Sequence, residues 1–193
     1  MRHERSRAPL VAQISRNHDM MLRMATRLTR AVTEVERHAA GRGWDQPPRL
    51  YALVPTGDLL TQQRELTLRL GLAGADPAGL TPIEQEALPG DRPLNDVLAA
   101  VAWPAEVAGC ALVVERLMLP PGADADAPTE GDLAAWVANH PGRQEVRIAV
   151  GVLRDGSQDA AVRLRAHDAD ADVLSGPALV PALADALAAT LDD

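Results

Sequence analysis

The sequence predicts a single α+β domain over residues 1–193, in which a mainly antiparallel sheet of about four strands carries a long N-terminal helix and a C-terminal helix. Three observations support this fold class. Apolar residues recur with helical spacing at both ends of the chain, four segments with strand character lie between them, and two of these segments are close enough to form a tight hairpin.

The first predicted element is a helix over residues 10–40, preceded by residues 1–8, which we expect to be flexible. Pro9 suits the start of this helix and Gly41 suits its end. The residues that recur at every seventh position are Ile14, Met21, Leu28 and Val35. At 1.5 Å per residue the helix would be about 46 Å long, which is more than a small domain covers. Its apolar line is therefore expected to pair with a second copy of the chain, or else to anchor the helix to its own core.

The middle of the chain is predicted to alternate strands with short helices. Residues 49–54 (RLYALV) form the first expected strand, and Thr56 then caps a helix that ends near Leu70. The segment Thr81-Pro82-Ile83-Glu84 predicts the start of a helical turn, because threonine and glutamate at this spacing cap each other's backbone N–H groups. A short helix over residues 94–102 is expected to follow.

The second half of the chain is predicted to add the remaining strands and two more helices. Residues 109–119 form a strongly apolar second strand, and Thr129 caps a helix that carries Trp136. The last helix begins near Pro181 and repeats leucine at every fourth position. These leucines are Leu179, Leu183, Leu187 and Leu191.

The hairpin over residues 144–167 is the element that the sequence defines best. A two-residue turn at Asp155-Gly156 would place Val152 opposite Asp159, and thus a core residue beside an acid. A three-residue loop that ends at Gly156, in the left-handed region, avoids this pairing. The residues then expected in the core are Val146, Ile148, Val150 and Val152. The residues expected on the more exposed face are Arg147, Arg163 and Arg165.

Composition predicts a soluble cytoplasmic protein without a membrane partner. No apolar run approaches the roughly 18 residues of a membrane span, and the N-terminal residues MRHERSRAPL lack the apolar region of a secretory signal. Cys110 is the single cysteine and cannot form an internal disulfide. It lies in an apolar stretch, where we expect it to pack as a small core residue.

Charge is spread unevenly along the chain, whose net charge is −8. Residues 1–49 hold ten arginines and five acids, whereas residues 50–193 hold nine arginines and 22 acids. Nucleic-acid binding is disfavoured, because an acidic body repels phosphate. One tyrosine and three tryptophans also give little support for stacking on bases.

Several enzyme classes are excluded by residues that the sequence lacks. Because the chain has no lysine, it has no P-loop lysine, no Schiff base and no attachment point for pyridoxal phosphate. HExxH, paired CxxC, GxSxG and GxGxxG motifs are also absent. The sequence therefore predicts no catalytic residue and no cofactor, and it favours a protein that is not an enzyme.

The acidic run that begins at His167 looks like a cluster of metal ligands. A calcium-binding EF-hand loop that started at Asp168 would need glycine in place of Val173 and a carboxylate in place of Leu179. Both conditions fail, so we predict no metal site and no specific calcium binding here. The acids concerned are Asp168, Asp170 and Asp172.

Two groups of arginines are the candidate binding residues. The first group follows the side of the long helix opposite its apolar line and consists of Arg16, Arg23, Arg30 and Arg37. The second group lies on the outer face of the hairpin and consists of Arg147, Arg163 and Arg165 with His167. Each group is either a solvated face that keeps the fold soluble, or a surface that binds acidic protein, phosphate or carboxylate groups.

Several stretches resemble a family of conserved hypothetical proteins from high-GC actinobacteria. They are WDQPPRLYALVPT, LTPIEQEALP, WPAEVAGCALVVERLMLPP, GRQEVRIAVGVLRDGS and RLRAHDADADVLSGPALVP. The resemblance covers most of the chain from about residue 44 onward, together with the arginine-rich helix. That family is uncharacterised and has no assigned activity, so the resemblance implies no site residues. The order helix–sheet–helix is similar, at the level of fold alone, to small α+β proteins related to type III secretion chaperones.

These observations favour a non-enzymatic cytoplasmic protein, adaptor or chaperone-like, that binds another protein or a second copy of itself through its basic faces. A first alternative is a domain that binds a small molecule or an anion through the second arginine group. A second alternative is an enzyme assembled from scattered residues such as Glu115, His167 and Asp168. A deep concave site lined by arginines would favour a small ligand, whereas a flat basic face beside apolar patches would favour a protein partner.

Overall fold

The computed structural model describes residues 27–89, 92–120, 122–123, 128 and 132–192. Within these residues the chain forms a six-stranded antiparallel sheet with the order β2-β1-β3-β4-β5-β6. The strands are β1 Arg49–Pro55, β2 Leu80–Glu84, β3 Gly109–Met118, β4 Gln144–Leu153, β5 Gln158–Leu164 and β6 Leu174–Ser175. The α+β class and the antiparallel sheet are confirmed. The number of strands was wrong, because β2 and β6 at the two edges were not predicted.

The helices of the described part are short. Residues 27–40 form a helix, called helix 27–40 below. The others are α2 Thr56–Gln62, α3 Arg64–Arg69, α4 Leu94–Leu98, α5 Leu133–Asn139 and α6 Pro181–Ala188, with 3₁₀ turns at Asp170–Asp172 and Ala189–Leu191. Of the helix predicted over residues 10–40, residues 27–40 are helical, and residues 1–26, including the segment expected to be flexible, lie outside the described residues. Among the described helices, none has the length and apolar character needed to cross a membrane.

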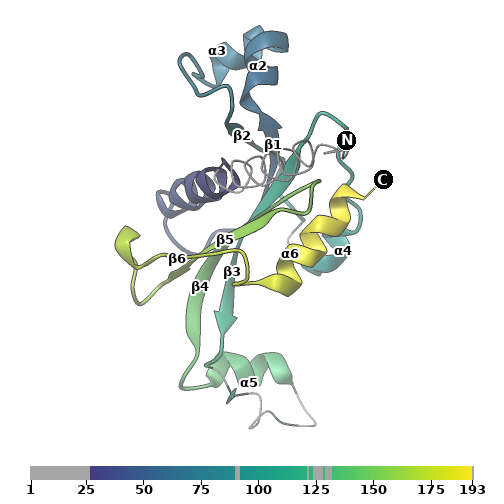
Figure 1. Cartoon of the computed structure of the whole chain (residues 1–193). Coiled ribbons are helices and arrows are strands. Elements are labelled where there is room, and N and C mark those ends of the chain that lie inside the picture. Colours follow the sequence, from purple (N-terminus) through teal and green to yellow (C-terminus); the bar gives the residue numbers. More distant parts are fainter. Residues whose placement is uncertain (1–26, 90–91, 121, 124–127, 129–131, 193) are drawn as a thin grey trace, which may run out of the picture.

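One face of the sheet is covered by α6 and α4 (Figure 1). Strand side chains alternate between faces, and on this face they are large and apolar. The strand residues include Leu112, Val114, Ile148, Val150 and Val162. The residues that pack on them include Leu98, Trp103, Ala184, Leu187 and Leu191. The predicted packing of the C-terminal helix on the sheet is therefore confirmed.

Helix 27–40 covers the opposite face, where β1 carries the large residues Tyr51 and Leu53 and the central strands carry small residues. The small residues of β3, β4 and β5 are Ala111, Ala149, Gly151 and Ala161. A Cβ atom added to Gly151 would lie only 2.7 Å from Val32 Cγ2 and 3.0 Å from Leu28 Cδ1. The helix can therefore approach the sheet closely only because this position lacks a side chain.

This packing corrects the expectation that the apolar line of the N-terminal helix pairs with a second copy. Leu28 and Val35 are 0% and 2% exposed and belong to the core of this chain. The other two members of the line, Ile14 and Met21, lie outside the described residues. For the described part of the line, the alternative of an anchor to the chain's own core is the observed one.

The register of the β4–β5 hairpin follows the three-residue loop. Gly156 has a φ of +84°, and Val152 lies opposite Gln158, not Asp159. The four valine and isoleucine residues expected in the core are all buried. The exposure expected on the other face was wrong for two residues: Arg147 and Arg163 are 0% and 2% exposed, whereas Arg165 is exposed.

The segment predicted as a capped helical turn at 81–84 is instead strand β2. Its glutamate does not cap a helix, because the Glu84 carboxylate binds Arg42 and Arg49. The N–H of Gln85 donates to the backbone oxygen of Leu50 in β1, and the oxygen of Gly79 accepts from the N–H of Thr56, just after β1. Odd-numbered residues of β2 therefore face β1, and Pro82 faces the free edge. Proline is tolerated there because the outward position needs no backbone N–H.

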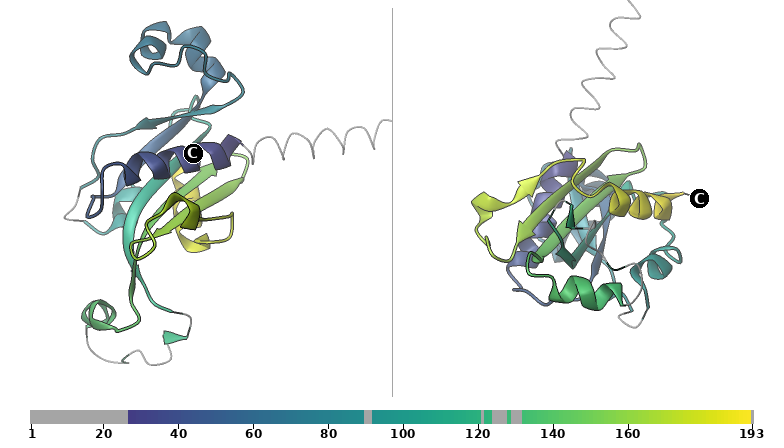
Figure 2. Two further views of the ribbon diagram at one scale, coloured as in Figure 1. Left: turned by 90° about the vertical axis from the view of Figure 1, so that its left-hand side faces the viewer. Right: turned by 90° about the horizontal axis from the view of Figure 1, so that it is seen from below.

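Helices in the connections between strands extend beyond the sheet at two opposite ends (Figure 2). Helices α2 and α3 lie in the connection between β1 and β2, at the top of Figure 1. Helix α5 lies in the connection between β3 and β4, at the bottom. The predicted helix from Thr56 is divided at Gln63, whose φ and ψ of −127° and 56° are not helical.

Candidate functional site

Arg163 is the centre of a buried ion-pair cluster between the hairpin and helix 27–40. Its Nε and Nη2 atoms donate to the two carboxylate oxygens of Glu36, at 2.6 and 2.8 Å. Both side chains are 2% exposed. Nη2 also donates to Asp170 at 2.7 Å, and Nη1 to the backbone oxygen of Asp168 at 3.0 Å. These donated bonds raise the pKa of Arg163, first of all the bond to Glu36, and lower the pKa of Asp170.

Arg147 belongs to a second cluster on the same face of the sheet. It lies on β4, directly opposite Arg163 of β5. It is paired with the carboxylate of Glu115 at 2.9 Å and donates to the backbone oxygen of Gly43. Its guanidinium lies 4.3 Å from the ring centre of Trp44, a cation–π contact. The indole Nε1 of Trp44 in turn donates to Asp168 at 3.0 Å, which joins the two clusters. The turn after helix 27–40 is therefore fastened to the sheet through Trp44.

Arg165 forms the exposed rim of this arrangement. Its Nη1 and Nη2 atoms donate to the carboxylate of Asp45 at 2.9 and 3.0 Å, and Nη1 also donates to Glu145 at 2.6 Å. The guanidinium lies 5.5 Å from the ring centre of Trp44. The hydrogen bond from Arg165 lowers the pKa of Asp45. Because these side chains are exposed, the pairs are screened by water and salt.

The second arginine group is thus brought together, but its charges are largely used within the protein. Arg147 binds the partly buried Glu115, and Arg163 binds the buried Glu36. Arg165 binds two exposed carboxylates, and His167 is exposed. In the first group, Arg30 and Arg37 are exposed on helix 27–40, and Arg30 lies 3.6 Å from Asp76. Arg16 and Arg23 lie outside the described residues.

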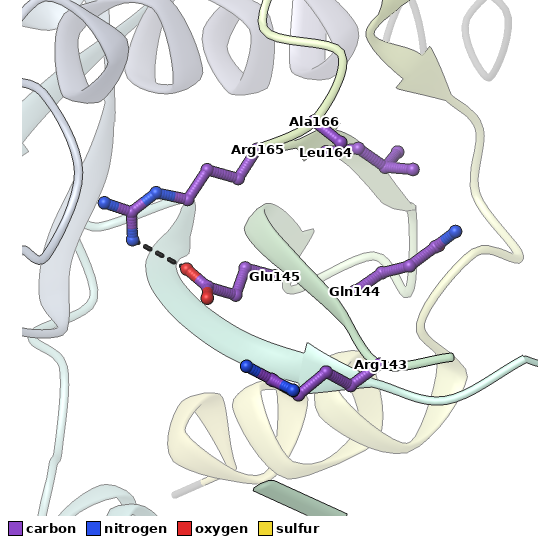
Figure 3. A pocket seen from close by; sticks show the side chains of 6 residues that line it. All are labelled: Arg143, Gln144, Glu145, Leu164, Arg165 and Ala166. Atoms are coloured by element: carbon purple, nitrogen blue, oxygen red, sulfur yellow. Dashed lines mark hydrogen bonds and ion pairs between the residues drawn. The ribbon is translucent and has the colours of Figure 1, made fainter. Parts of the chain in front are cut away.

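An open surface lies beside the rim, at the end of the sheet that carries α5. A hollow of about 420 Å³ is lined by Arg143, Gln144, Glu145, Leu164, Arg165 and Ala166 (Figure 3). In Figure 3 the side chain of Arg165 extends toward Glu145 across this hollow. A smaller hollow of about 180 Å³ adjoins Trp44, Glu115 and Leu117. Large apolar side chains are exposed at this end: Leu117, Met118 and Leu133, at 39%, 41% and 55%.

The residues considered for catalysis or metal binding are placed as follows. Glu115 is paired with Arg147 and accepts hydrogen bonds from the backbone N–H groups that follow Trp44, whereas Asp168 is paired with Arg163 and accepts from the indole of Trp44. Within the described part of the chain, no three histidine, cysteine or acidic residues are grouped so that they could hold a metal ion. Cys110 lies in the core, and burial raises the pKa of its thiol to about 11. It therefore lacks the thiolate that a nucleophile requires at neutral pH.

A family model described as PPA1309-like protein matches residues 28–192. The chain belongs to this family. The match extends over the six strands and over α2 to α6, and its description names no activity. Comparison with curated proteins gave no match, and comparison with solved structures gave none either.

In this member of the PPA1309-like family, sequence reasoning missed Glu36, Trp44 and Asp45 as partners of the hairpin arginines. Glu36 carried a usable signal. It follows Val32 by four residues and precedes Ala39 by three, so it falls on the buried side of the helix. A charged residue in that position requires a buried partner of opposite charge. Trp44 and Asp45 lie in a turn without periodicity, and no comparable signal marks them.

Proposed function

We propose that the protein is a non-enzymatic cytoplasmic protein that binds another protein through the end of the sheet that carries α5. The observation that carries this proposal is the group of exposed apolar side chains Leu117, Met118 and Leu133 beside an open hollow with charged walls. Apolar anchors surrounded by a polar rim are typical of protein–protein interfaces.

The charged side chains of this surface are arranged as the polar rim of a protein interface, and not as a pocket that binds an anion. Arg116 and Arg143 are exposed beside the apolar side chains, while Arg165 is engaged by Asp45 and Glu145. The two buried arginines are neutralised by carboxylates inside the protein. Binding of a phosphate or carboxylate by the arginine cluster is therefore not favoured, because the anion would have to displace these acids.

The sheet edges offer little for recognition by strand addition. At the free edge of β2, the outward-facing residue Pro82 has no backbone N–H to donate to an added strand. At the other edge, β6 is only two residues long. Short strands and proline are the usual ways in which natural sheets protect their edges. A partner is thus expected to bind side chains at the α5 end, and that partner is either another protein or a second copy of this chain.

Site-specific photocrosslinking in the native cell tests this proposal. A photoreactive amino acid is placed at Met118 or at Leu133, and in the control at Asp155, which lies in the β4–β5 turn at the opposite end of these strands. We expect specific adducts from the first two positions and none from the third. The adducts should disappear when Leu117→Glu is added, while the circular dichroism of the variant stays unchanged. Equal labelling from all three positions would refute the proposed surface.

A further inference from the structure

A second hollow lies at the free edge of β2, on the side of helix 27–40. Its volume is about 420 Å³, within the range of about 300–1,000 Å³ that is usual for small-molecule sites. Its walls are mainly apolar. They include Val35 of the helix, Leu70 and Leu72 at the end of α3 and just after it, and Pro82 and Ile83 of β2. Leu70 is 40% exposed, so a molecule in the hollow would shield an apolar side chain that water now contacts.

Tyr51 lines this hollow, and its hydroxyl group has no hydrogen-bond partner among the described residues. Tyr51 is 3% exposed, and its hydroxyl oxygen is buried and bonded to no group among the described residues. A buried hydroxyl that is left unpaired costs free energy, whereas one that meets an acceptor does not. Burial raises the pKa of Tyr51, and the nearby Glu84 raises it as well. The group therefore keeps its proton at neutral pH and is available as a donor.

The charged groups around the hollow already compensate one another. Glu84 lies directly opposite Tyr51 in the β1–β2 ladder. Its carboxylate accepts bonds from Arg42, at 3.1 and 3.0 Å, and from Arg49. Burial opposes the ionisation of Glu84, but these bonds outweigh it and hold its pKa below the usual value. The ionisable side chains that line the hollow are Glu34, Glu84 and His38, whose Nε2 lies 3.8 Å from the Glu84 carboxylate. Arg42 and Arg49 are not among the lining residues, but their bonds to Glu84 offset its charge, so the hollow carries no excess of positive charge to attract an anion.

We propose that this hollow binds a neutral, mostly apolar small molecule whose carbonyl oxygen accepts a hydrogen bond from Tyr51. The apolar walls favour a molecule with an apolar body, and the unpaired Tyr51 hydroxyl favours one that carries a hydrogen-bond acceptor. Because the charges around the hollow offset one another, a neutral molecule is favoured over an ion. The site is independent of the protein-binding surface proposed above. It lies toward α2 and α3, at the end of the sheet opposite α5 (Figure 1).

The isoleucine content of the chain gives a direct test by NMR. The chain has three isoleucines, of which Ile83 lines the hollow and Ile148 lies in the core on the α4–α6 face. The full-length protein is labelled at the isoleucine δ1-methyl groups and titrated with acetophenone, a small neutral aromatic ketone. We expect the Ile83 signal to shift and saturate, while the Ile148 signal does not move.

The matched variant is Tyr51→Phe, which removes only the hydroxyl group. It should bind acetophenone about threefold to tenfold more weakly, the loss expected for one neutral hydrogen bond. An unchanged Ile148 signal shows that the variant is folded. Absence of a saturable Ile83 shift, a parallel shift of Ile148, or equal affinity in Tyr51→Phe would each overturn the proposal. None of these results bears on the crosslinking at α5, so the two proposals fail separately.

Discussion

The two faces of the sheet are buried by different chemistry. On the α4–α6 face, large apolar strand residues meet large apolar helix residues. On the face of helix 27–40, small residues of β3, β4 and β5 lie under the helix beside Tyr51 and Leu53 of β1. On the same face, Arg147 and Arg163 are buried with acids as partners. The first face depends on close packing, which tolerates conservative exchange. The second depends on pairing, so loss of Arg163 leaves the buried carboxylate of Glu36 without the arginine that compensates its charge.

The largest effect is therefore expected from Arg163→Ala, which leaves Glu36 buried without its partner. We expect a loss of about 3–5 kcal/mol in the free energy of unfolding, measured by urea denaturation. The double variant Glu36→Leu/Arg163→Met should lose much less, because it leaves no unpaired buried charge; Asp170, which also loses Arg163, is exposed to water. Arg165→Ala is the control on the exposed rim and should have a small effect. Equal losses in Arg163→Ala and Arg165→Ala would show that burial of the pair is not what matters.

An intermediate effect is expected where helix 27–40 meets the small residues. Gly151→Ala would place a Cβ atom against Val32 and Leu28, and we expect it to cost about 1–3 kcal/mol. Val32→Ala in the same chain makes room for that Cβ, so the double variant should be more stable than the sum of the single losses predicts. A double-mutant cycle by urea denaturation measures this coupling. Strict additivity would mean that the helix does not rest on Gly151.

The smallest effect is expected at the exposed pair of Asp45 and Arg165. The pKa of Asp45 is lowered in the folded protein, so its contribution is present above the usual aspartate pKa of about 3.9 and is lost as the pH falls through the lower folded value. Wild type should thus exceed Asp45→Asn slightly in melting temperature near neutral pH, and this difference should vanish in acid or in concentrated salt. A difference that grows in acid would contradict the assigned direction.

The sequence was sufficient to predict which apolar residues of the hairpin are buried, but it was not sufficient to predict that two of its arginines are buried as well. Alternation in β4 and β5 correctly identified the buried valines, and the position of Gly156 correctly set the register of the hairpin. The arginines alternate with those valines, so they were assigned to solvent. The evidence against this was local: Ala149 and Gly151 share their side of β4 with Arg147. Small residues on the second side of a strand indicate that an element covers it.

The candidate surfaces were less predictable, because they depend on contacts between distant segments. Glu84 had a good local explanation as a capping residue, yet it binds Arg42 and Arg49 from outside its own strand. Residues 81–84 form a strand because they pair with β1. This tertiary pairing overrides the local preference of the segment for a capped helical turn. The exposed side chains at α5 follow from where β3 and β4 end, which no periodicity in the sequence reveals.

The placement of the three tryptophans gives this protein separate optical reporters. Trp44 lies beneath two guanidinium groups, Trp103 is 9% exposed in the core and donates to Thr190, and Trp136 contacts the ring of His140 at the α5 end. A chain that retains one of them at a time therefore emits from the ion-pair face, the apolar core or the α5 end alone. Comparison of the three emission curves during unfolding distinguishes a molecule that melts as one unit from one that loosens at its α5 end first.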